Sequence, residues 1–427
     1  MASEETPTMT QTPIRTESAP EAKTAPTRAW AVRLMIVGIV LAALNLRPAI
    51  TSLGALLEEV RDGLGMSGSV AGLLTSVPPL CFAIFGVMAP RLARRFGPGA
   101  VVCAGMAAIA AGLVIRPFTG STVGFLVASG LALMGIAVSN VLMPVIVKRW
   151  FPDRVGSMTG LYSMALALGT SLAAAVTVPM TDALGGNWKT GLAVWAALAV
   201  AAVVPWVPLV RERGAEGGTT AGTSQQDDGL RITRSRTAWA LAVFFGLQAT
   251  AAYITMGWMA QIFRDAGVSA GTAGVLLAVT MAMGVPLAFV IPRLATRLPS
   301  QGPIVIALGV CGLAGYAGLY LAPSGGAWAW AILLGISNCA FPLALTMVGM
   351  RARTGTGVAK LSAFAQSTGY LISIPGPLLV GVLYQHSGGW GVPIALMAAL
   401  MVPQIVVGVI AGRNRTVEDE AAPADAA

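Results

Sequence analysis

The sequence is poor in charge, and this limits the class of protein that it can encode. Of its 427 residues only 11% are charged, 56% are hydrophobic, and the mean hydropathy is +0.75. Soluble domains carry about 25% charged residues, so the composition excludes an ordinary soluble domain and predicts an integral membrane protein. The net charge of +9 does not indicate nucleic-acid binding, because the charges form short clusters between apolar runs. We expect a lipid bilayer around the chain and no nucleic acid bound to it.

Histidine, metal-ligand spacings and nucleotide-binding motifs are scarce or missing as well. The single histidine, His386, falls in a predicted external loop, and the four cysteines lie in apolar segments without metal-ligand spacing. The motif Gly-x-x-x-x-Gly-Lys-Ser/Thr does not occur, which disfavours ATP-driven transport. An enzyme would need clustered His, Asp or Glu, and no predicted helix centre holds an acid. We therefore predict a protein that is not an enzyme and has no metal site and no cofactor.

Long uncharged runs dominate what is present. Charged residues and turn signals divide them into segments long enough to cross a bilayer. The predicted spans are Leu34–Leu57, Val70–Ala89, Pro98–Ile115, Ser121–Val147, Ser157–Met180, Thr190–Leu209, Thr237–Phe263, Ala270–Ile291, Pro303–Leu321, Ala327–Met350, Leu361–Leu383 and Gly391–Ile410. The predicted fold class is an all-α integral membrane protein with twelve transmembrane helices in two sets of six.

A hydrophilic stretch separates the two sets of spans. We assign residues 30–210 to an N-terminal six-helix bundle and residues 237–412 to a C-terminal one, with a cytoplasmic linker at 211–236. Residues 1–29 are rich in Thr, Pro, Ala and Glu without a hydrophobic pattern, and residues 413–427 end in an acidic, Ala-rich stretch. Both are expected to be disordered cytoplasmic tails.

The distribution of basic residues predicts the orientation. Of the 27 Lys and Arg residues, only Arg61, Arg116, Lys189 and Arg264 fall on the side opposite the termini, and Arg47 lies within the first span. Lys and Arg accumulate on the cytoplasmic side of membrane proteins. We therefore expect a multi-pass protein of the cytoplasmic membrane with both termini in the cytoplasm. Arg116 is interpreted as a surface anchor at the outer end of the third span.

The two halves repeat each other at an offset of about 200 residues. The matching pairs are Arg61-Asp-Gly-Leu-Gly-Met-Ser with Arg264-Asp-Ala-Gly-Val-Ser, Pro90-Arg-Leu-Ala-Arg-Arg with Pro292-Arg-Leu-Ala-Thr-Arg, and Ser139-Asn-Val-Leu-Met-Pro with Ser337-Asn-Cys-Ala-Phe-Pro. Two parallel repeats joined by a hydrophilic loop are typical of a transporter whose two bundles rock about a central site.

Arg47 is the one charge in the middle of a predicted span. Leu34–Leu57 covers about 36 Å as a helix, which places Arg47 near the centre of the bilayer, and Pro48 is expected to open the helix there. A buried guanidinium can hold a carboxylate, cyanate, nitro or phosphate group. The alternative is a structural arginine held by backbone carbonyls that Pro48 releases. Arg47 has no counterpart in the seventh span, where Ala251-Ala-Tyr-Ile-Thr stands instead.

Other polar residues inside the spans are candidate solute-binding residues. They are Asn45, Thr51, Asn140, Tyr162, Gln248, Tyr253, Asn338, Gln366 and Tyr370. Hydrogen bonding between helices of one bundle would explain each of them equally well. Glu58 shares a helical face with Arg47 and is a candidate proton relay, with a solvated helix end as the alternative. Trp258 would stack on a planar solute or pack at an interface.

The chain resembles a known family in two places. Twelve helices in two repeats, with Pro90-Arg-Leu-Ala-Arg-Arg-Phe-Gly after the second, resemble the major facilitator superfamily over roughly residues 30–412. Asn45–Gly54 resembles the first helix of the cyanate and 2-nitroimidazole permease family, and Pro90–Gly97 fits that family too. The resemblance implies a secondary active transporter that moves a small anionic or polar solute by alternating access.

The same resemblance implies an inner gate after the second helix. The residues it assigns to gating are Arg91, Arg94 and Arg95, together with Pro48, and Arg94 stands where the superfamily usually has Asp. The other function classes are an exporter of drugs or organic compounds from the same superfamily and a polytopic enzyme or receptor. The missing membrane carboxylate argues against export of cations but not against export of neutral or anionic compounds. We expect a monomer.

Overall fold

The computed structural model describes residues 26–208, 210 and 231–421. Most of these residues are helical, and no strand occurs among them. Twelve segments are long and apolar enough to cross a membrane, so the predicted all-α architecture is confirmed. They are Trp30–Ala55, Gly68–Phe96, Pro98–Phe118, Thr122–Trp150, Ser157–Ala183, Trp188–Pro208, Arg236–Asp265, Ala270–Arg297, Gly302–Leu321, Ala327–Met350, Gly357–Ser387 and Gly391–Ala411.

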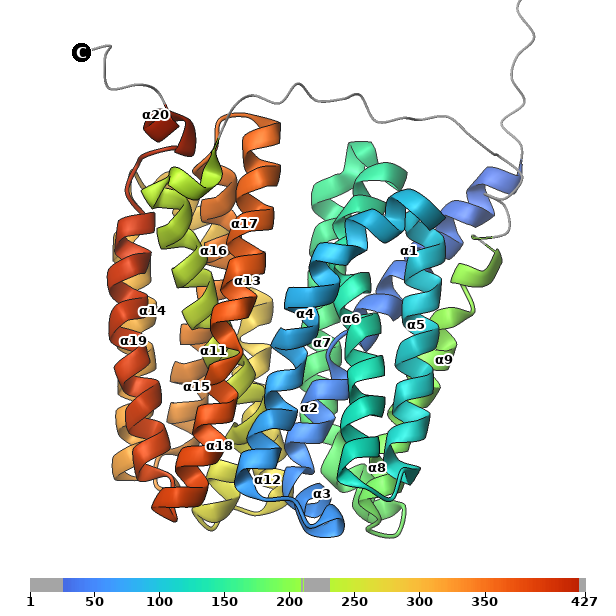
Figure 1. Cartoon of the computed structure of the whole chain (residues 1–427), viewed down its shortest axis with the longest axis vertical. Helices are drawn as coiled ribbons and strands as arrows, with labels where there is room; N and C mark the ends of the chain where they lie inside the picture. The colour runs from blue at the N-terminus through green and yellow to red at the C-terminus, as the bar shows by residue number, and fades with distance from the viewer. Residues whose placement is uncertain (1–25, 209, 211–230, 422–427) are drawn as a thin grey trace, which may run out of the picture.

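Several of these spans consist of two helices in series (Figure 1). The N-terminal half contains α1 (Pro26–Asn45), α2 (Pro48–Ala55), α3 (Leu57–Leu64), α4 (Gly68–Phe96), α5 (Pro98–Ile115), α6 (Thr122–Trp150), α7 (Val155–Ala183), α8 (Trp188–Ala193) and α9 (Trp195–Val203). The C-terminal half contains α11 (Arg236–Asp265), α12 (Ala270–Ala282), α13 (Gly284–Arg297), α14 (Gly302–Leu321), α15 (Ala327–Asn338), α16 (Ala340–Met350), α17 (Gly355–Ser373), α18 (Pro375–Ser387), α19 (Gly391–Ala411) and α20 (Val417–Ala421).

Proline causes the break in the first span. Helix α1 ends at Asn45, and α2 begins at Pro48, which needs no hydrogen bond for a backbone N–H at the first helical position. Arg47 precedes it with φ −126° and ψ −27°, outside helical geometry. The predicted opening of the helix at Pro48 is thus confirmed. The eleventh span is divided in the same way, because α18 begins at Pro375.

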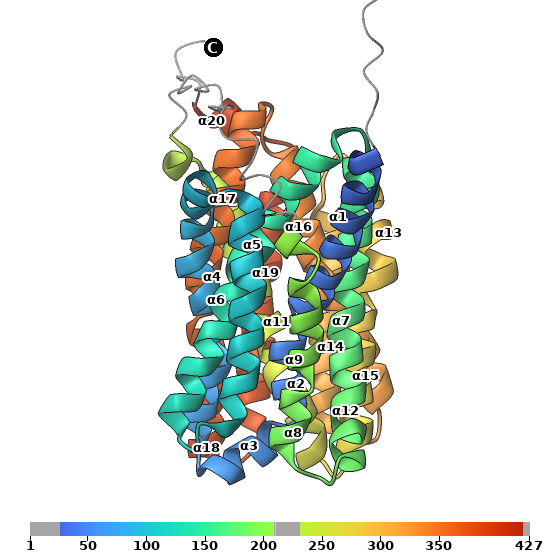
Figure 2. The same cartoon turned by 90° about the vertical axis from the view of Figure 1, so that its right-hand side faces the viewer.

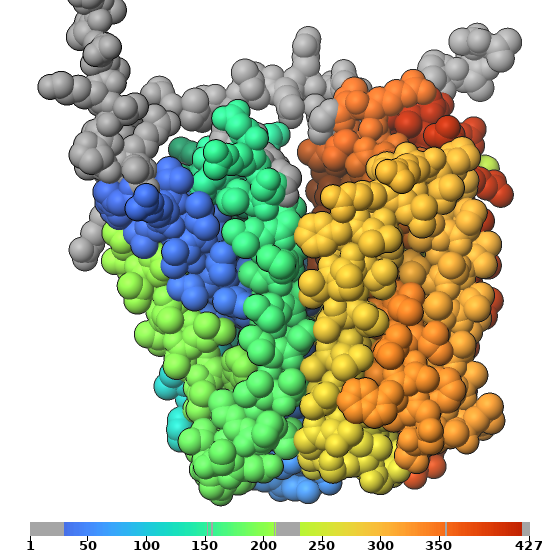
Figure 3. Space-filling view, turned by 180° about the vertical axis from the view of Figure 1, so that it is seen from behind, coloured from blue at the N-terminus to red at the C-terminus, as the bar shows by residue number. Residues whose placement is uncertain are grey.

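The helices gather into two groups, one for each half of the chain (Figure 1). Figure 2 views the N-terminal half from its outer side, with α5 and α9 in front of α6 and α2. The halves contact each other mainly through α7 with α12, α4 with α18, and α2 with α11. The space-filling view in Figure 3 shows the two halves meeting in a continuous seam at the end away from the C-terminus, whereas they are set apart at the C-terminal end.

Glycines make the closed end of the seam tight. The backbone of Gly54 in α2 lies against α11, so that a Cβ there would be 2.0 Å from the carbonyl oxygen of Met256. Gly72 in α4 and Gly381 in α18 face each other in the same way, since a Cβ on Gly381 would lie 2.7 Å from the Cα of Gly72. Small residues allow helix backbones to approach closely in a membrane. The two halves are therefore packed backbone to backbone at this end.

The C-terminal tail departs from the expectation of disorder. Residues 413–421 are described, and α20 packs against the C-terminal half: Val417 N–H donates to the Arg351 carbonyl at 2.9 Å. Glu420 accepts hydrogen bonds from the hydroxyls of Ser235 (2.6 Å) and Thr237 (2.8 Å) at the start of α11. The prediction of a disordered tail is therefore wrong for residues 413–421. Residues 26–29 of the predicted N-terminal tail already belong to α1, and within the predicted linker Ile232–Arg234 form a short 3-10 helix before α11 begins at Arg236. Residues 1–25, 211–230 and 422–427, which carry the rest of the tail and linker predictions, lie outside the described residues.

Candidate functional site

Arg47 lies where the backbone leaves the helix between α1 and α2. Its carbonyl accepts hydrogen bonds from the backbone N–H of Ile50 (2.9 Å) and of Thr51 (3.1 Å), and from the Thr51 hydroxyl (3.2 Å). The backbone of this residue is therefore fixed by the first turn of α2. Its side chain is half-buried, and none of the ion pairs among the described residues involves it. The guanidinium is held in place without a carboxylate to neutralise it.

Three tyrosines from both halves lie near this guanidinium. Arg47 is close enough to the hydroxyls of Tyr162 in α7, Tyr253 in α11 and Tyr370 in α17 to interact with them electrostatically, and Tyr253 is the one near enough for a side-chain hydrogen bond. The Tyr162 hydroxyl also bonds to the side-chain oxygen of Asn140 in α6. Five of the predicted binding residues are thus brought together between the two halves.

Aromatic rings line one side of the region around Arg47. Phe82 of α4 stacks on Tyr370 with ring centroids 4.9 Å apart and an interplanar angle of 26°. Tyr253 lies 6.5 Å from both rings, and Phe245 meets Tyr370 edge-on at 5.2 Å. An unpaired cation beside flat aromatic faces and hydroxyl groups can bind a small planar anion or polar molecule through hydrogen bonds and stacking.

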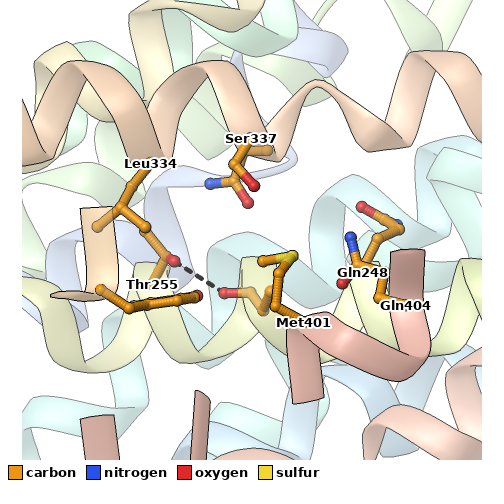
Figure 4. Close-up of a pocket in the computed structure, with 9 residues that line it drawn as sticks. Gln248, Thr255, Leu334, Ser337, Met401 and Gln404 are labelled. Atoms are coloured by element: carbon orange, nitrogen blue, oxygen red, sulfur yellow. Dashed lines mark hydrogen bonds between the residues drawn. The ribbon is translucent and has the colours of Figure 1, made fainter. Parts of the chain in front are cut away.

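Gln248 and Asn338 belong to a different place inside the C-terminal half. They line a small cavity together with Thr255, Ser337 and Gln404, drawn in Figure 4, where the Thr255 hydroxyl donates to the Ala251 carbonyl at 2.8 Å. This cavity is walled by α11, α14, α15 and α19. The structure therefore separates these two predicted residues from the group around Arg47.

The remaining predicted polar residues have local surroundings. Gln366 donates to the Ser362 hydroxyl in its own helix at 2.7 Å. Asn45 is 1% exposed, and neither atom of its side-chain amide has a hydrogen-bond partner in the described part of the chain. Trp258 is fully buried at the seam and donates to the Thr75 hydroxyl of α4 at 3.1 Å, so it packs between the halves.

Glu58 lies in an ionic cluster at the closed end of the seam. Arg264 of α11 contacts Glu58 at 2.8 Å and Glu59 at 3.0 Å, which ties α3 to the other half. Asp265 accepts hydrogen bonds from Tyr384 (2.9 Å) and Trp390 (2.7 Å) beside this pair. This end faces outward in the orientation predicted from the basic residues, so we call Glu58, Glu59 and Arg264 the outer ionic cluster. A proton-relay role for Glu58 stays a prediction, and its position makes it part of the closure.

The arginines predicted to gate lie at the opposite end of the molecule. Arg91, Arg94 and Arg95 are exposed near the end of α4. Arg91 donates to the Val87 carbonyl at 3.5 Å, and Arg95 lies 5.2 Å from the Phe96 ring, so both contacts stay within α4 and its own half. The halves are set apart at this end (Figure 3), and gating by these arginines stays a prediction.

The structure corrects the interpretation of Arg116 as a surface anchor. Its side chain is only 1% exposed, Nη1 donates to the Ala49 carbonyl of α2 at 3.0 Å, and the guanidinium lies 5.9 Å from the Phe125 ring. The repeat gives no signal of this burial. Gly112-Leu-Val-Ile-Arg-Pro aligns with Gly318-Leu-Tyr-Leu-Ala-Pro, and Ala322, which follows α14 as Arg116 follows α5, is exposed.

Comparison with known proteins agrees with this architecture. The model of the Major Facilitator Superfamily matches residues 35–373. Solved structures of similar fold include the nucleoside transporter NupG (TM-score 0.72, 12% identity, covering 89% of this chain and 99% of that one). The inward-open conformation of the xylose transporter XylE from E. coli is another (TM-score 0.70, 11% identity, covering 91% and 99%). At these identities the structures show the fold alone.

Similar sequences of known or suspected transporters cover most of the chain. The uncharacterized transporter YycB of Bacillus subtilis (strain 168) is 35% identical over 89% of this chain and 94% of its own length. The 2-nitroimidazole transporter of Escherichia coli (strain K12) is 31% identical (90% and 96%), and the cyanate transport protein CynX of the same organism is 30% identical (87% and 96%). The chain therefore belongs to the major facilitator superfamily and is a multi-pass membrane transporter rather than an enzyme.

Proposed function

We propose that the protein is a secondary transporter that moves a small anionic or polar solute by alternating access, and that Arg47 binds the solute. The observation that carries the proposal is a half-buried guanidinium between the two halves with no carboxylate partner among the described residues. A charge at membrane depth is costly unless it serves a site or a water-filled cavity. An anion or a polar group of the solute would supply the missing partner.

The surroundings favour a flat solute of modest size. The stacked rings of Phe82 and Tyr370 offer planar faces, and the hydroxyls of Tyr162 and Tyr253 offer hydrogen bonds beside the cation. Two similar proteins are named for transport of 2-nitroimidazole and of cyanate, and a third, similar over 22% of this chain, is named a putative anionic 4-hydroxybenzoate permease. These compounds share planar or linear shape and a polar or anionic group that a guanidinium can hold.

Alternating access is supported by the difference between the two ends of the seam. The end bearing the outer ionic cluster is closed by Gly54 packed on α11 and by Arg264 bridging the halves, whereas the C-terminal end is set apart (Figure 3). In this proposal the structure is the state open toward the side of the termini. Basic residues such as Arg94 and Arg95 lie on that side, so we assign it to the cytoplasm.

The test is uptake by the purified protein in liposomes with labelled cyanate, 2-nitroimidazole and 4-hydroxybenzoate as the solutes. Transport of at least one of them by the wild type, with loss of more than about hundredfold in Arg47→Met, is the expected result, since a charge-assisted fork is removed. Arg33→Met replaces an exposed arginine in the same span and should transport normally. Undiminished uptake by a well-folded Arg47→Met protein would refute the role of Arg47. Transport of hydrophobic cations alone would refute the solute class.

A further inference from the structure

Arg116 is a buried cation whose hydrogen-bonding capacity is only partly used. Nη1 donates to the Ala49 carbonyl, while Nε and Nη2 have no hydrogen-bond partner in the described part of the chain. These two nitrogens form one edge of the guanidinium, the edge that binds both oxygens of a carboxylate side by side. The bond to Ala49 therefore leaves a complete bidentate fork free.

A narrow cavity lies in front of this residue. Its walls come from α2, α4, α6 and α11, and they include Arg116, Leu53, Thr75, Ser129 and Tyr253. Ser129 is 1% exposed, and its hydroxyl has no partner among the described residues. The Thr75 hydroxyl, by contrast, already accepts from Trp258 and donates to the Gly72 carbonyl. The polar groups left free in this cavity are thus the Arg116 fork and the Ser129 hydroxyl.

The cavity adjoins the Arg47 site through one shared residue. Tyr253 forms part of its wall and is also the tyrosine that Arg47 reaches. The free space is about that of one water molecule here. Its walls belong to both halves, since α2 and α4 lie in one and α11 in the other. Separation of the halves at this end would therefore widen it toward the outside.

The other half has no charge at the corresponding position. Arg116 directly follows the last residue of α5, and Ala322 directly follows the last residue of α14. The repeated plan is thus built with an uncharged side chain at this position in the C-terminal half. An arginine adds a desolvated cation, which is costly without an anion to balance it.

We propose that Arg116 and Ser129 form a second anion-binding subsite, on the outer side of Arg47, that takes a small planar monoanion such as a carboxylate. The two free guanidinium N–H groups hold the anion side by side, and the Ser129 hydroxyl donates a third hydrogen bond. The subsite is collapsed while the outer end is closed and opens when the halves part there. It rests on the proposed function in that the same solute would pass from Arg116 to Arg47.

The test uses formate, the smallest carboxylate, as the probe and the full-length purified protein. The thermal unfolding midpoint is followed during formate titration, with gluconate at the same ionic strength as the control for salt. An anion that binds only the folded state raises the midpoint as its site fills. The Arg47→Met variant isolates the outer subsite, and Arg116→Gln in that background keeps an N–H donor for the Ala49 carbonyl while removing the charge. Arg33→Gln in the same background neutralises an exposed arginine as the matched control.

Formate is expected to stabilise the Arg47→Met protein, and Arg116→Gln is expected to raise the half-effective formate concentration about tenfold or more, whereas Arg33→Gln leaves it unchanged. Ser129→Ala leaves the bond between Arg116 and Ala49 intact and should raise the half-effective formate concentration several-fold. This variant provides the test if the Arg116→Gln protein does not fold. Equal stabilisation with and without Arg116 and Ser129, or no stabilisation of Arg47→Met at all, would overturn the subsite. Failure of the Arg47 proposal would be seen separately: formate would then raise the unfolding midpoint of the wild type and of Arg47→Met equally.

Discussion

The two halves of this protein share one six-helix plan but differ in charge. The N-terminal half holds two guanidinium groups away from the surface, Arg47 and Arg116, each without a carboxylate partner among the described residues. The corresponding positions of the C-terminal half hold uncharged residues, around Ala251 and at Ala322. The C-terminal half does bury one guanidinium, Arg351, but this group is bound to the Ala411 and Gly412 carbonyls and to Gln301, away from the Arg47 site. The C-terminal half instead supplies the hydroxyl and ring of Tyr253 and Tyr370. In the proposed function the N-terminal half therefore carries the charge that binds the solute, and the C-terminal half closes over it.

The largest expected effect comes from preventing the two halves from closing. Gly54→Val places a branched side chain where a Cβ would already lie 2.0 Å from the Met256 carbonyl, so the outer end should not close and transport should be lost entirely. Uptake into liposomes measures this directly. Gly271→Val, at a position with open space around it, is the matched control and should transport normally. Wild-type uptake by Gly54→Val would show that this closure is not required.

The contribution of the C-terminal half to the site is tested by Tyr253→Phe. This change keeps the ring but removes the hydroxyl that interacts with Arg47, and the loss of one hydrogen bond should raise the half-saturating solute concentration roughly three- to tenfold. Tyr320→Phe, an exposed tyrosine of the same half, is the control. Unchanged affinity in Tyr253→Phe would mean that this hydroxyl of the C-terminal half does not contribute to solute binding.

A smaller effect is expected from the outer ionic cluster. Arg264→Gln removes ion pairs with Glu58 and Glu59, but all three side chains are partly exposed and such pairs contribute little, about 0–1 kcal/mol each. The open population at this end should rise only about two- to fivefold. This population can be measured with the variant Leu53→Cys, in which the native cysteines are also replaced. The rate at which a membrane-impermeant maleimide labels it reports the open population. A hundredfold faster reaction would mean that the ionic cluster, and not glycine packing, holds the halves together.

The last prediction concerns stability rather than transport and a contact that lies within the C-terminal half. Burial opposes ionisation of Glu420, but hydrogen bonds from Ser235 and Thr237 outweigh it and lower its pKa. A lowered pKa in the folded protein stabilises it above the pKa of the unfolded chain, about 4.3, and this stability is lost as the pH falls through the folded pKa. Glu420→Gln should therefore cost about 1 kcal/mol at neutral pH, as a lost helix cap does, and nothing in strong acid. Thermal unfolding at both pH values checks this, and a cost that is equal at both would contradict it.

Much of the fold followed from the sequence, because a bilayer imposes simple rules on it. Uncharged runs of membrane length predicted the twelve spans, and Pro48 predicted the break beside Arg47, since both depend on local chemistry. The burial of Arg116 did not follow. Its position at the end of a span suits a surface anchor, and only the packing of α2 and α6 around it places it inside.

Contacts between residues far apart in the chain could not be predicted from the sequence either. The pairing of Glu58 with Arg264 depends on how the two halves meet, which no local pattern contains. Helix α20 was missed because a five-residue helix is not stable alone and is held by contacts such as those of Glu420 with Ser235 and Thr237. In the candidate site, sequence alone selected residues inside spans but could not separate the group around Arg47 from the cavity around Gln248.

The most direct test of the account is equilibrium binding of the labelled transported solute to the purified protein, with Arg47 and its replacements compared. Binding should be lost in Arg47→Met and partly retained in Arg47→Lys, which keeps the charge but not the planar fork. Moving the cation to the other half, in Arg47→Met combined with Ala251→Arg, should not restore it. Binding of wild-type strength to Arg47→Met, or full rescue by Ala251→Arg, would contradict the claim that the N-terminal half carries the charge that binds the solute.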